Sequence, residues 1–366
     1  MKITVERNVL SQVTNNLSRM VSAKSAIPAL EGLLIAAEGE NLTVTAYDLE
    51  TGLIKSVPAD ISRNGSVVLS ARTFADIVRK LDGEKVSLEV EGDKCIVACG
   101  NARFTLPYIE AAEFPEMPAL DRQNDYTFTA EMFKSVVRQT VFSVAVTDIK
   151  PVHMGLMFDI EDEILTVVGV DGYRLAVRRE KLAGVANNNF IIPARAVNEI
   201  IKLLGEGTEE VGLFVGSRHV CIEAGGYILI SRLLDGEFLD YNRAIPKENK
   251  TRLCVNTRVI ADTIDRVSPV VNERLKSPVK CTIKDNLFVA CCSTPIGTAE
   301  DEFPVQIEGD EVEIGFNNRY MLDALKAAET DEIIMEFSGA LNPVILKPTD
   351  GDSFLFLVLP VRLKNG

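Results

Sequence analysis

The chain contains no tryptophan and only two histidines among its 366 residues, and aromatic side chains make up 6% of it. Without clustered aromatics, a stacking platform for single-stranded nucleic acid is not predicted. His153 and His219 stand in unrelated contexts, with no H-x-x-x-H pair and no G-x-S-x-G. We expect both to be structural or surface residues, and the sequence predicts neither a metal site nor a hydrolase triad.

The seven cysteines are an odd number and include no C-x-x-C pair, which favours reduced thiols over disulfides or zinc. The adjacent Cys291 and Cys292 in "LFVACC" are predicted to be two buried thiols, not a redox centre. No run approaches the roughly 18 apolar residues of a membrane span, and "MKITVERNVL" does not read as a targeting segment. We therefore expect a cytoplasmic protein.

Positive charge is scarce overall but unevenly placed. With 39 Lys and Arg against 53 Asp and Glu, the formal net charge is −14, which by itself argues against a nucleic-acid partner. The six helices that we expect, within windows 6–24, 70–82, 129–144, 193–204, 256–276 and 317–328, hold sixteen basic and nine acidic residues, a net of +7. The remainder then carries −21, so a body that repels nucleic acid except along a helical surface is predicted.

One amphipathic helix is written three times, as "ARTFADIVRKL" (71–81), "ARAVNEIIKLL" (194–204) and "NRYMLDALKAA" (318–328). Arg72, Arg195 and Arg319 align at spacings of 123 and 124, each followed by an acid four residues on and a base seven residues on. These charges share one helix face, and the apolar offsets 2, 5, 6 and 9 centre on the opposite face. Each helix is expected to lie on a sheet with its charged face in water.

The repeat extends beyond the helices. "TAYDLETGLIKSV" (45–57) pairs with "VGVDGYRLAVRRE" (168–180), which places Asp48 and Asp171 also 123 residues apart. Polar seams then divide the chain into three domains, residues 1–121, 122–247 and 248–366. Between helices, stretches such as "NLTVTAYD", "KVSLEVEG" and "SFLFLVLP" alternate as antiparallel strands do. The predicted class is α+β, with two helix-plus-strands units per domain.

Asp48 and Asp171 are also candidates for a pair of catalytic carboxylates. The equivalent position of the third domain is Thr294, and aspartate is a preferred turn residue. We therefore expect two structural turns, and keep a duplicated α+β ligand-binding enzyme that uses the two acids only as an alternative.

The quoted repeats together with "DGEFLDYNRAIP", "EIGFNNRYMLDAL" and "LVLPVRL" make the chain resemble, over its whole length, the bacterial DNA polymerase III β subunit family, the sliding clamps. The resemblance implies a homodimeric ring of clamp-type domains, with helices lining a central hole and antiparallel sheets outside. It also implies a non-enzymatic processivity factor without cofactor or metal. Its implied partners are duplex DNA, bound topologically and without sequence readout, and a replicative polymerase, a clamp loader and repair proteins, but no membrane. A clamp-like paralogue for a specialised repair polymerase remains an alternative.

The resemblance implies three sets of site residues. The DNA-facing bases are Lys24, Arg72 and Lys150 by similarity, and Arg79, Arg195, Lys202, Arg319 and Lys326 from the charged helix face. A hydrophobic cleft for partner peptides, between the second and third domains, is expected from Val170, Gly172, Tyr173, Arg174, Leu175, Leu239, Arg243, Ala244, Tyr320, Pro343, Val344, Leu357, Leu359, Pro360, Val361 and Arg362. At the dimer contact, Lys94, Arg103, Phe104 and Leu106 would meet the partner's Pro269, Val270, Glu300, Asp301 and Glu302.

Three features depart from the family pattern. His153 stands where the family often has an aliphatic residue in the cleft, and Leu239 replaces a common proline. "KNG" extends the chain beyond Leu363. These departures bear on which peptides the cleft prefers, not on whether the cleft exists.

Overall fold

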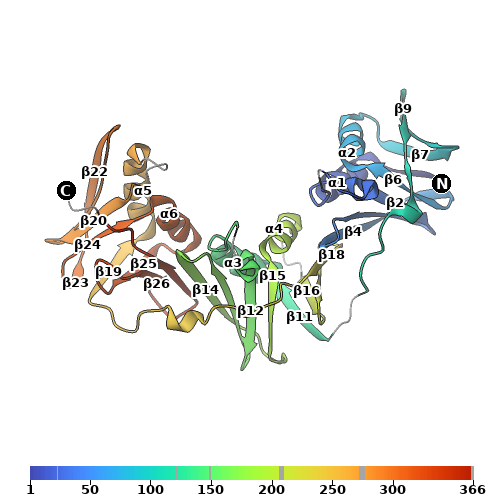
Figure 1. Ribbon diagram of the computed structural model, residues 1–366. Helices are drawn as coiled ribbons and strands as arrows, with labels where there is room; N and C mark the ends of the chain where they lie inside the picture. Colours follow the sequence, from blue (N-terminus) through green and yellow to red (C-terminus); the bar gives the residue numbers. More distant parts are fainter. Residues whose placement is uncertain (23, 120–122, 148–149, 206–209, 272–276, 364–366) are drawn as a thin grey trace. The chain divides into compact units, whose positions relative to one another are not determined.

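The computed structural model describes residues 1–366 except 23, 120–122, 148–149, 206–209, 272–276 and 364–366. The chain divides into two compact units, which are described separately (Figure 1). Unit 1 is Met1–Phe133 with Glu199–Leu233, and unit 2 is Lys134–Asn198 with Leu234–Gly366. No helix in the described part of the chain has the length and apolar character needed to cross a membrane.

The six expected helices are confirmed. They are α1 Arg7–Leu17, α2 Ala71–Lys80, α3 Ala130–Val141, α4 Ala194–Leu203, α5 Thr257–Val267 and α6 Asn318–Ala327. Each begins at the end of a strand, and α5 and α6 are capped by Asn256 and Asn317, whose side chains accept backbone N–H groups of the first turn. The rest is mainly antiparallel strand, so the predicted α+β class is confirmed.

Unit 1 contains two antiparallel sheets. The smaller has the order β5-β1-β7-β8-β9, and the larger has the order β10-β6-β2-β3-β4-β18-β17-β16-β11. The smaller sheet comprises β5 Asp60–Arg63, β1 Lys2–Glu6, β7 Lys85–Glu91, β8 Lys94–Cys99 and β9 Ala102–Pro107. The larger comprises β10 Ile109–Glu110, β6 Gly65–Ser70, β2 Gly32–Glu38, β3 Asn41–Tyr47, β4 Thr51–Pro58, β18 Tyr227–Arg232, β17 His219–Ala224, β16 Glu210–Val215 and β11 Asn124–Thr129. Pairing of β4 with β18 joins segments about 170 residues apart into one surface.

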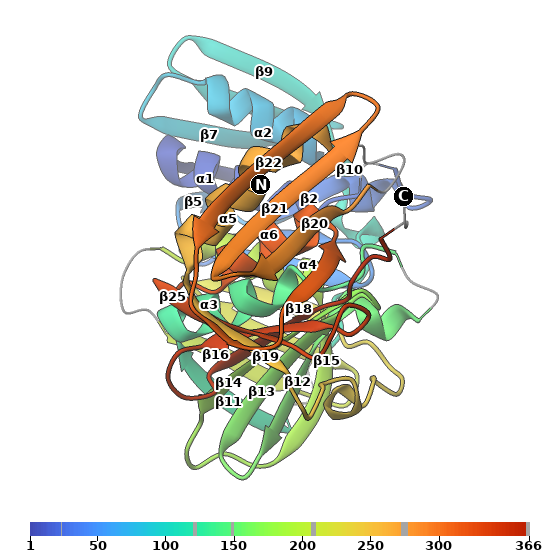
Figure 2. The same cartoon turned by 90° about the vertical axis from the view of Figure 1, so that its left-hand side faces the viewer.

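Unit 2 repeats this plan. Its nine-stranded sheet has the order β15-β12-β13-β14-β27-β26-β25-β19-β23, and its four-stranded sheet the order β22-β21-β20-β24. The large sheet comprises β15 Asn188–Pro193, β12 Gly155–Glu161, β13 Ile164–Val170, β14 Arg174–Lys181, β27 Phe354–Val358, β26 Val344–Pro348, β25 Glu332–Phe337, β19 Thr251–Asn256 and β23 Ile307–Gly309. The small one comprises β22 Gly297–Pro304, β21 Leu287–Thr294, β20 Val279–Lys284 and β24 Val312–Phe316, and Figure 2 shows β20, β21 and β22 side by side.

The repeated helices bury the faces that the periodicity predicts, with two exceptions. In the third copy all four apolar positions are buried, including Ala328, which directly follows α6. Most of the apolar positions of the first and second copies are buried as well. Ile77 in α2 and Ile201 in α4 are only half-buried, so the prediction was wrong for these two. The aligned bases Arg72, Arg195 and Arg319 are all exposed, as the charged face requires.

Asp48 and Asp171 occupy matching turns between strands. The Asp48 Oδ1 accepts the backbone N–H of Glu50 and Thr51, at 3.1 and 2.7 Å. In the second domain, the Asp171 Oδ1 accepts the N–H of Tyr173 and Arg174, at 2.9 and 3.0 Å. These are Asx turns, in which the carboxylate replaces a backbone acceptor. The acids have the structural role that turn chemistry predicts, and the enzyme alternative loses its catalytic pair.

The cysteines are free thiols, and most are small core residues. Burial raises the pKa of Cys95 to about 11 and that of Cys281 to about 12, which keeps both protonated. Cys254 is exposed. Cys292 is buried as predicted, but Cys291 is only half-buried, because adjacent strand residues point to opposite faces of the sheet.

Candidate binding surfaces

The expected cleft of unit 2 contains a cavity of about 500 Å³. Two backbone hydrogen bonds shape one wall of this cavity. The Leu359 N–H donates to the Tyr173 carbonyl at 2.9 Å, and the Val361 N–H donates to the Gly315 carbonyl at 2.8 Å. The Asp171 turn projects Tyr173 outward, leaving its side chain 57% exposed. The lining residues are Tyr173, Val271, Ser277, Asn317, Asn318, Arg319, Tyr320, Leu359, Pro360 and Val361.

The sixteen predicted cleft residues differ in accessibility. Seven are exposed: Gly172, Tyr173, Leu239, Arg243, Ala244, Leu359 and Arg362. Five are half-buried: Arg174, Tyr320, Pro343, Pro360 and Val361. Val170, Leu175, Val344 and Leu357 are buried core residues, so the structure does not place them on an accessible surface. Leu234, Phe238, Tyr241 and Ile245 pack against Val170, Leu175 and Leu357, and none of these four was among the predicted cleft residues.

The structure describes two of the three departures from the family pattern, His153 and Leu239. The His153 ring meets Phe238 edge-on, with 5.9 Å between ring centroids, and Leu239 next to Phe238 is 42% exposed. The side chain of Arg243 pairs with Asp240 at 2.8 Å and is largely in water. The C-terminal Lys-Asn-Gly lies outside the described residues.

Arg174 connects the two sides of the cleft. Its Nε lies 2.9 Å from Asp171 Oδ2 and its Nη1 2.7 Å from Asp323 Oδ2 on α6. The guanidinium carbon lies 4.5 Å from the Tyr320 ring centroid and 5.6 Å from that of Phe142. The side chain is only 11% exposed. With two carboxylates already bound, Arg174 holds the cleft together and has little capacity for a further anion.

Burial, and after it the carboxylate of Asp171, raises the pKa of the Tyr320 phenol above its ordinary value. The phenol therefore remains neutral at physiological pH. The Tyr173 ring lies beside it, with 6.0 Å between centroids. These two rings give the cavity an aromatic wall that carries no charge.

We expect Arg174→Gln to lower the free energy of unfolding by about 2–3 kcal/mol, because it leaves two partly buried carboxylates without their cation. Urea denaturation measures this change. Arg243→Gln is the matched control, since its exposed ion pair is worth at most about 1 kcal/mol. Equal midpoints for the two variants would contradict the bridging role of Arg174.

The predicted DNA-facing bases are all exposed. Arg72 and Arg79 lie on α2, Arg195 and Lys202 on α4, and Arg319 and Lys326 on α6. Lys24 and Lys150 lie outside the helices: Lys24 follows α1 in a bend, and Lys150 precedes the short 3-10 helix Pro151–Met154. Six of the eight positions therefore sit on the repeated helices.

The third copy of the helix differs from the first two in its charge pairing. Arg79 pairs with Asp76 at 2.6 Å, and Lys202 pairs with Glu199 at 2.7 Å, each within its own helix. In α6 the equivalent acid, Asp323, is instead bound to Arg174 from the second domain. This difference depends on tertiary contact, which the repeat pattern cannot predict.

Strand β9 is an unpaired edge of unit 1, and its two faces differ. The register of β8 with β9 places Lys94 and Arg103 on one face. Phe104 and Leu106 alternate with them, and Phe104 is 37% exposed. Ile77, which the sequence assigned to the buried face of α2 and not to the dimer contact, lines a hollow of about 300 Å³ beside Phe104. Because Ile77 lines this hollow, it is only half-buried, unlike the other apolar positions of α2.

Strand β22 is an unpaired edge of unit 2 and carries the predicted acids. Glu300 and Glu302 are exposed on the face away from Phe288 and Phe303, whose rings stack at 5.1 Å. Asp301 points to the other face and pairs with Arg266 of α5 at 2.6 Å. Asp301 is therefore already neutralised within the chain, unlike its neighbours. Pro269 and Val270 lie in the 3-10 helix Ser268–Val270, and the Val270 carbonyl accepts the Thr294 hydroxyl at 2.8 Å.

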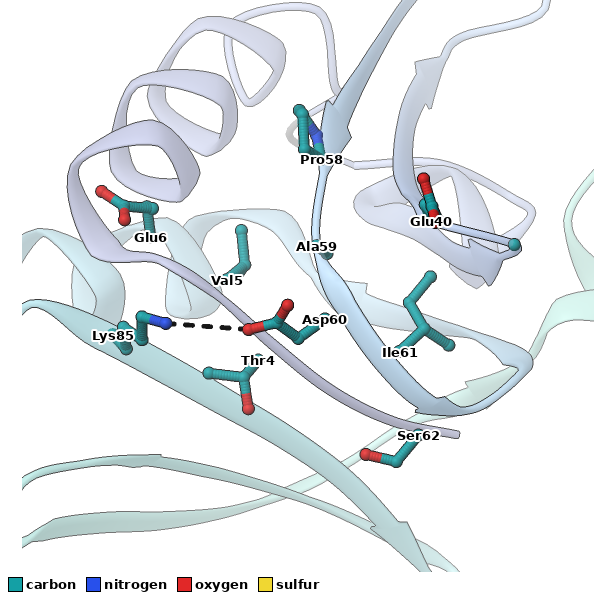
Figure 3. A pocket seen from close by; sticks show the side chains of 11 residues that line it. Thr4, Val5, Glu6, Glu40, Pro58, Ala59, Asp60, Ile61, Ser62 and Lys85 are labelled. Atoms are coloured by element: carbon teal, nitrogen blue, oxygen red, sulfur yellow. Dashed lines mark ion pairs between the residues drawn. The ribbon is translucent and has the colours of Figure 1, made fainter.

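Another hollow, of about 610 Å³, lies at the free edge of β5 in unit 1 (Figure 3). Its charged side chains are Glu6, Glu40, Asp60 and Lys85, of which Lys85 pairs with Asp60 at 3.7 Å. All four are exposed. Among the described residues, no group of His, Cys, Asp and Glu side chains could hold a metal ion.

Comparison with known proteins gives a consistent result. Family models of the DNA polymerase III beta subunit match its N-terminal domain at residues 1–118, its central domain at 127–240 and its C-terminal domain at 242–362. Beta sliding clamps of Staphylococcus epidermidis and Staphylococcus aureus are each 32% identical over 374 aligned residues, covering 99% of both chains.

Solved structures agree with these matches. The sliding clamp of Bacillus subtilis superposes with a TM-score of 0.96 at 31% identity, over 100% of both chains. A sliding clamp of Pseudomonas aeruginosa, solved bound to griselimycin, gives 0.93 at 26% identity, over 99% of this chain and 100% of that one. The chain thus belongs to the DNA polymerase III beta subunit family, the bacterial sliding clamps, and is a non-catalytic processivity factor.

Proposed function

We propose that two copies of this chain join head to tail into a ring that encircles duplex DNA. Each copy contributes three domains, residues 1–121, 122–247 and 248–366. The observation that carries the proposal is the pair of unpaired sheet edges with complementary charge. Arg103 lies on β9 and Lys94 on the adjacent β8, whereas Glu300 and Glu302 lie on β22.

Edge strands with free N–H and C=O groups are ready to pair with another chain. Pairing of β9 of one copy with β22 of the other would continue both sheets across the contact. On one face the bases would meet the acids, and on the other Phe104, Leu106 and Ile77 would be buried with the partner's Pro269 and Val270. Because the two edges differ, the contact is heterologous, and a second identical contact closes the pair.

The helix bases suit contact with a duplex without sequence preference. Flexible Lys and Arg side chains on exposed helix faces bind phosphates, which carry no direct sequence information. We assign this role to Lys24, Arg72, Arg79, Lys150, Arg195, Lys202 and Lys326. The acidic remainder of the chain limits binding elsewhere, so retention on DNA would depend on ring closure more than on affinity.

Partner proteins would dock by a short peptide in the cleft of unit 2. The exposed Tyr173, Leu239 and Leu359 offer apolar anchor sites, and Arg243 and Arg362 offer charge at the rim. Two or three anchors buried at about 1.5–3 kcal/mol each, less the cost of ordering a flexible peptide, correspond to an affinity no tighter than the order of micromolar. Such a site lets a polymerase, a clamp loader and repair proteins exchange.

After loading by a clamp loader on nicked circular DNA, the protein is expected to stay bound in a wash at about 1 M salt, where the Debye length is about 3 Å. Cutting the circle should release it, because the ring can then slide off an end. Gel filtration of labelled protein with the plasmid measures retention. Salt release that is equal for circles and linear DNA would indicate simple electrostatic binding and contradict the ring.

A further inference from the structure

Arg319 lies in the cavity of the cleft, although its repeat position suggests a DNA contact. Among the residues described by the structure that line the 500 Å³ cavity, Arg319 alone is charged, and the others present aromatic, aliphatic, amide and hydroxyl groups. Tyr173, Leu359 and Pro360 line the same cavity with it. A group held there would touch apolar side chains and one guanidinium.

The position of Arg319 is set by the start of α6. The Asn317 side chain accepts the backbone N–H of Arg319 at 3.0 Å and that of Tyr320 at 3.3 Å, which fixes the first turn of the helix. Met321 on the same turn is buried. The backbone that carries the Arg319 side chain is therefore anchored, and Tyr320 of the aromatic wall is its neighbour in the chain.

Arg174 and Arg319 differ in whether they are already paired. Arg174 is enclosed and bound by Asp171 and Asp323. Arg319 is exposed and forms no ion pair within the part of the chain that the structure describes. An incoming carboxylate can form a two-point, charge-assisted contact with a free guanidinium without displacing an existing partner.

The surroundings of this position differ among the three repeats. The residue after the aligned arginine is Thr73 in the first copy, Ala196 in the second and Tyr320 in the third. Only in the third copy does an aromatic side chain follow, and both it and the arginine line the cleft cavity. Arg319 thus has a local environment that Arg195 and Arg72 do not share.

We propose that Arg319 binds a carboxylate of the partner peptide, either an Asp or Glu side chain or the peptide's C-terminus, beside an apolar anchor seated against Tyr173 and Leu359. The inference rests on the proposed role of the cleft as the peptide site. It makes Arg319 a residue that determines specificity among partners, and removes it from the DNA-facing set.

Three synthetic peptides test the proposal by fluorescence anisotropy. The first is Ac-Ser-Leu-Asp-Leu-Phe-NH2, the second (the Asn twin) has Asn in place of its Asp, and the third is the Asn twin with a free C-terminal carboxylate. The wild-type protein should bind one of the two acidic peptides about fivefold to tenfold more tightly than the neutral twin, which also tells a side-chain carboxylate from a terminal one. Arg319→Gln should remove that preference while keeping the affinity for the neutral peptide. Arg319→Glu should reverse it toward a Lys twin.

Lys326→Gln is the matched control, because Lys326 is an exposed base on the same helix that does not line the cavity. It should retain the acidic preference in full. An Arg319→Gln protein that keeps the preference, or that loses only retention on circular DNA, would overturn the assignment and return Arg319 to the DNA contacts. Failure of the wild-type protein to bind any of the peptides would instead reject the cleft as a peptide site.

Discussion

Replacing Phe104 and Leu106 together by serine should convert the proposed dimer into a monomer of 40.1 kDa. Each apolar side chain removed from a buried contact costs about 1.5–3 kcal/mol, so the pair weakens each of the two contacts by about 3–6 kcal/mol. That corresponds to at least a hundredfold loss of affinity per contact. Light scattering after gel filtration reads the mass directly.

The control for this variant is Ile164→Ser, which removes an apolar side chain that is 44% exposed at the start of β13, away from both edges. It should remain dimeric. A charge test addresses the other face of the contact: Arg103→Glu should weaken the dimer, and Glu300→Lys with Glu302→Lys should restore it. An unchanged mass for the serine pair would show that β9 is not the contact.

Replacing Tyr173 and Leu359 together by serine should abolish polymerase stimulation while leaving the mass and thermal stability nearly unchanged. Both side chains are exposed, so the free protein loses little, but a peptide loses the surfaces that bury its anchors. A loss of about 3–6 kcal/mol corresponds to at least a hundredfold weaker binding. Primer extension on a long template and peptide anisotropy measure the effect.

Leu175 is the informative comparison for the cleft variant. It is 2% exposed and packed with Val170, Val177 and Leu357, so Leu175→Ser should destabilise unit 2 as well as the cleft. A lower unfolding midpoint for Leu175→Ser, with an unchanged midpoint for the Tyr173 and Leu359 pair, separates the core from the binding surface. Full polymerase stimulation by the pair would contradict the cleft assignment.

The structure adds contacts to the predicted site residues where a distant neighbour is involved. Asp301 pairs with Arg266, because it lies on the same face of β22 as Phe303, toward α5. Arg174 pairs with Asp323, some 150 residues away in the chain. Neither partner can be identified from spacing along the chain.

The local structure of this protein follows from its amino-acid sequence alone. A 3.6-residue period of apolar residues predicts six helices, alternation of apolar and polar residues predicts the strands, and the spacing of 123 residues predicts repeated units. The first two patterns relate residues that are near each other in the chain, and the third relates copies of one unit. Asp48 and Asp171 could be assigned to turns because an Asx turn closes within three residues.

The accessibility and the pairing of the predicted site residues depend on contacts between distant segments, which become visible in the folded chain. Apolar residues such as Val170, Leu175, Val344 and Leu357 occur both in binding clefts and in cores, and their burial assigns these four to the core. Val170, Leu175 and Leu357 are covered by Leu234, Phe238, Tyr241 and Ile245. Arg319 and Arg174 are likewise both arginines near one cavity. Arg174, at the start of β14, pairs with Asp323 of α6, whereas Arg319 is exposed. The difference arises because ion pairs form between neighbours in space and not between neighbours in the chain.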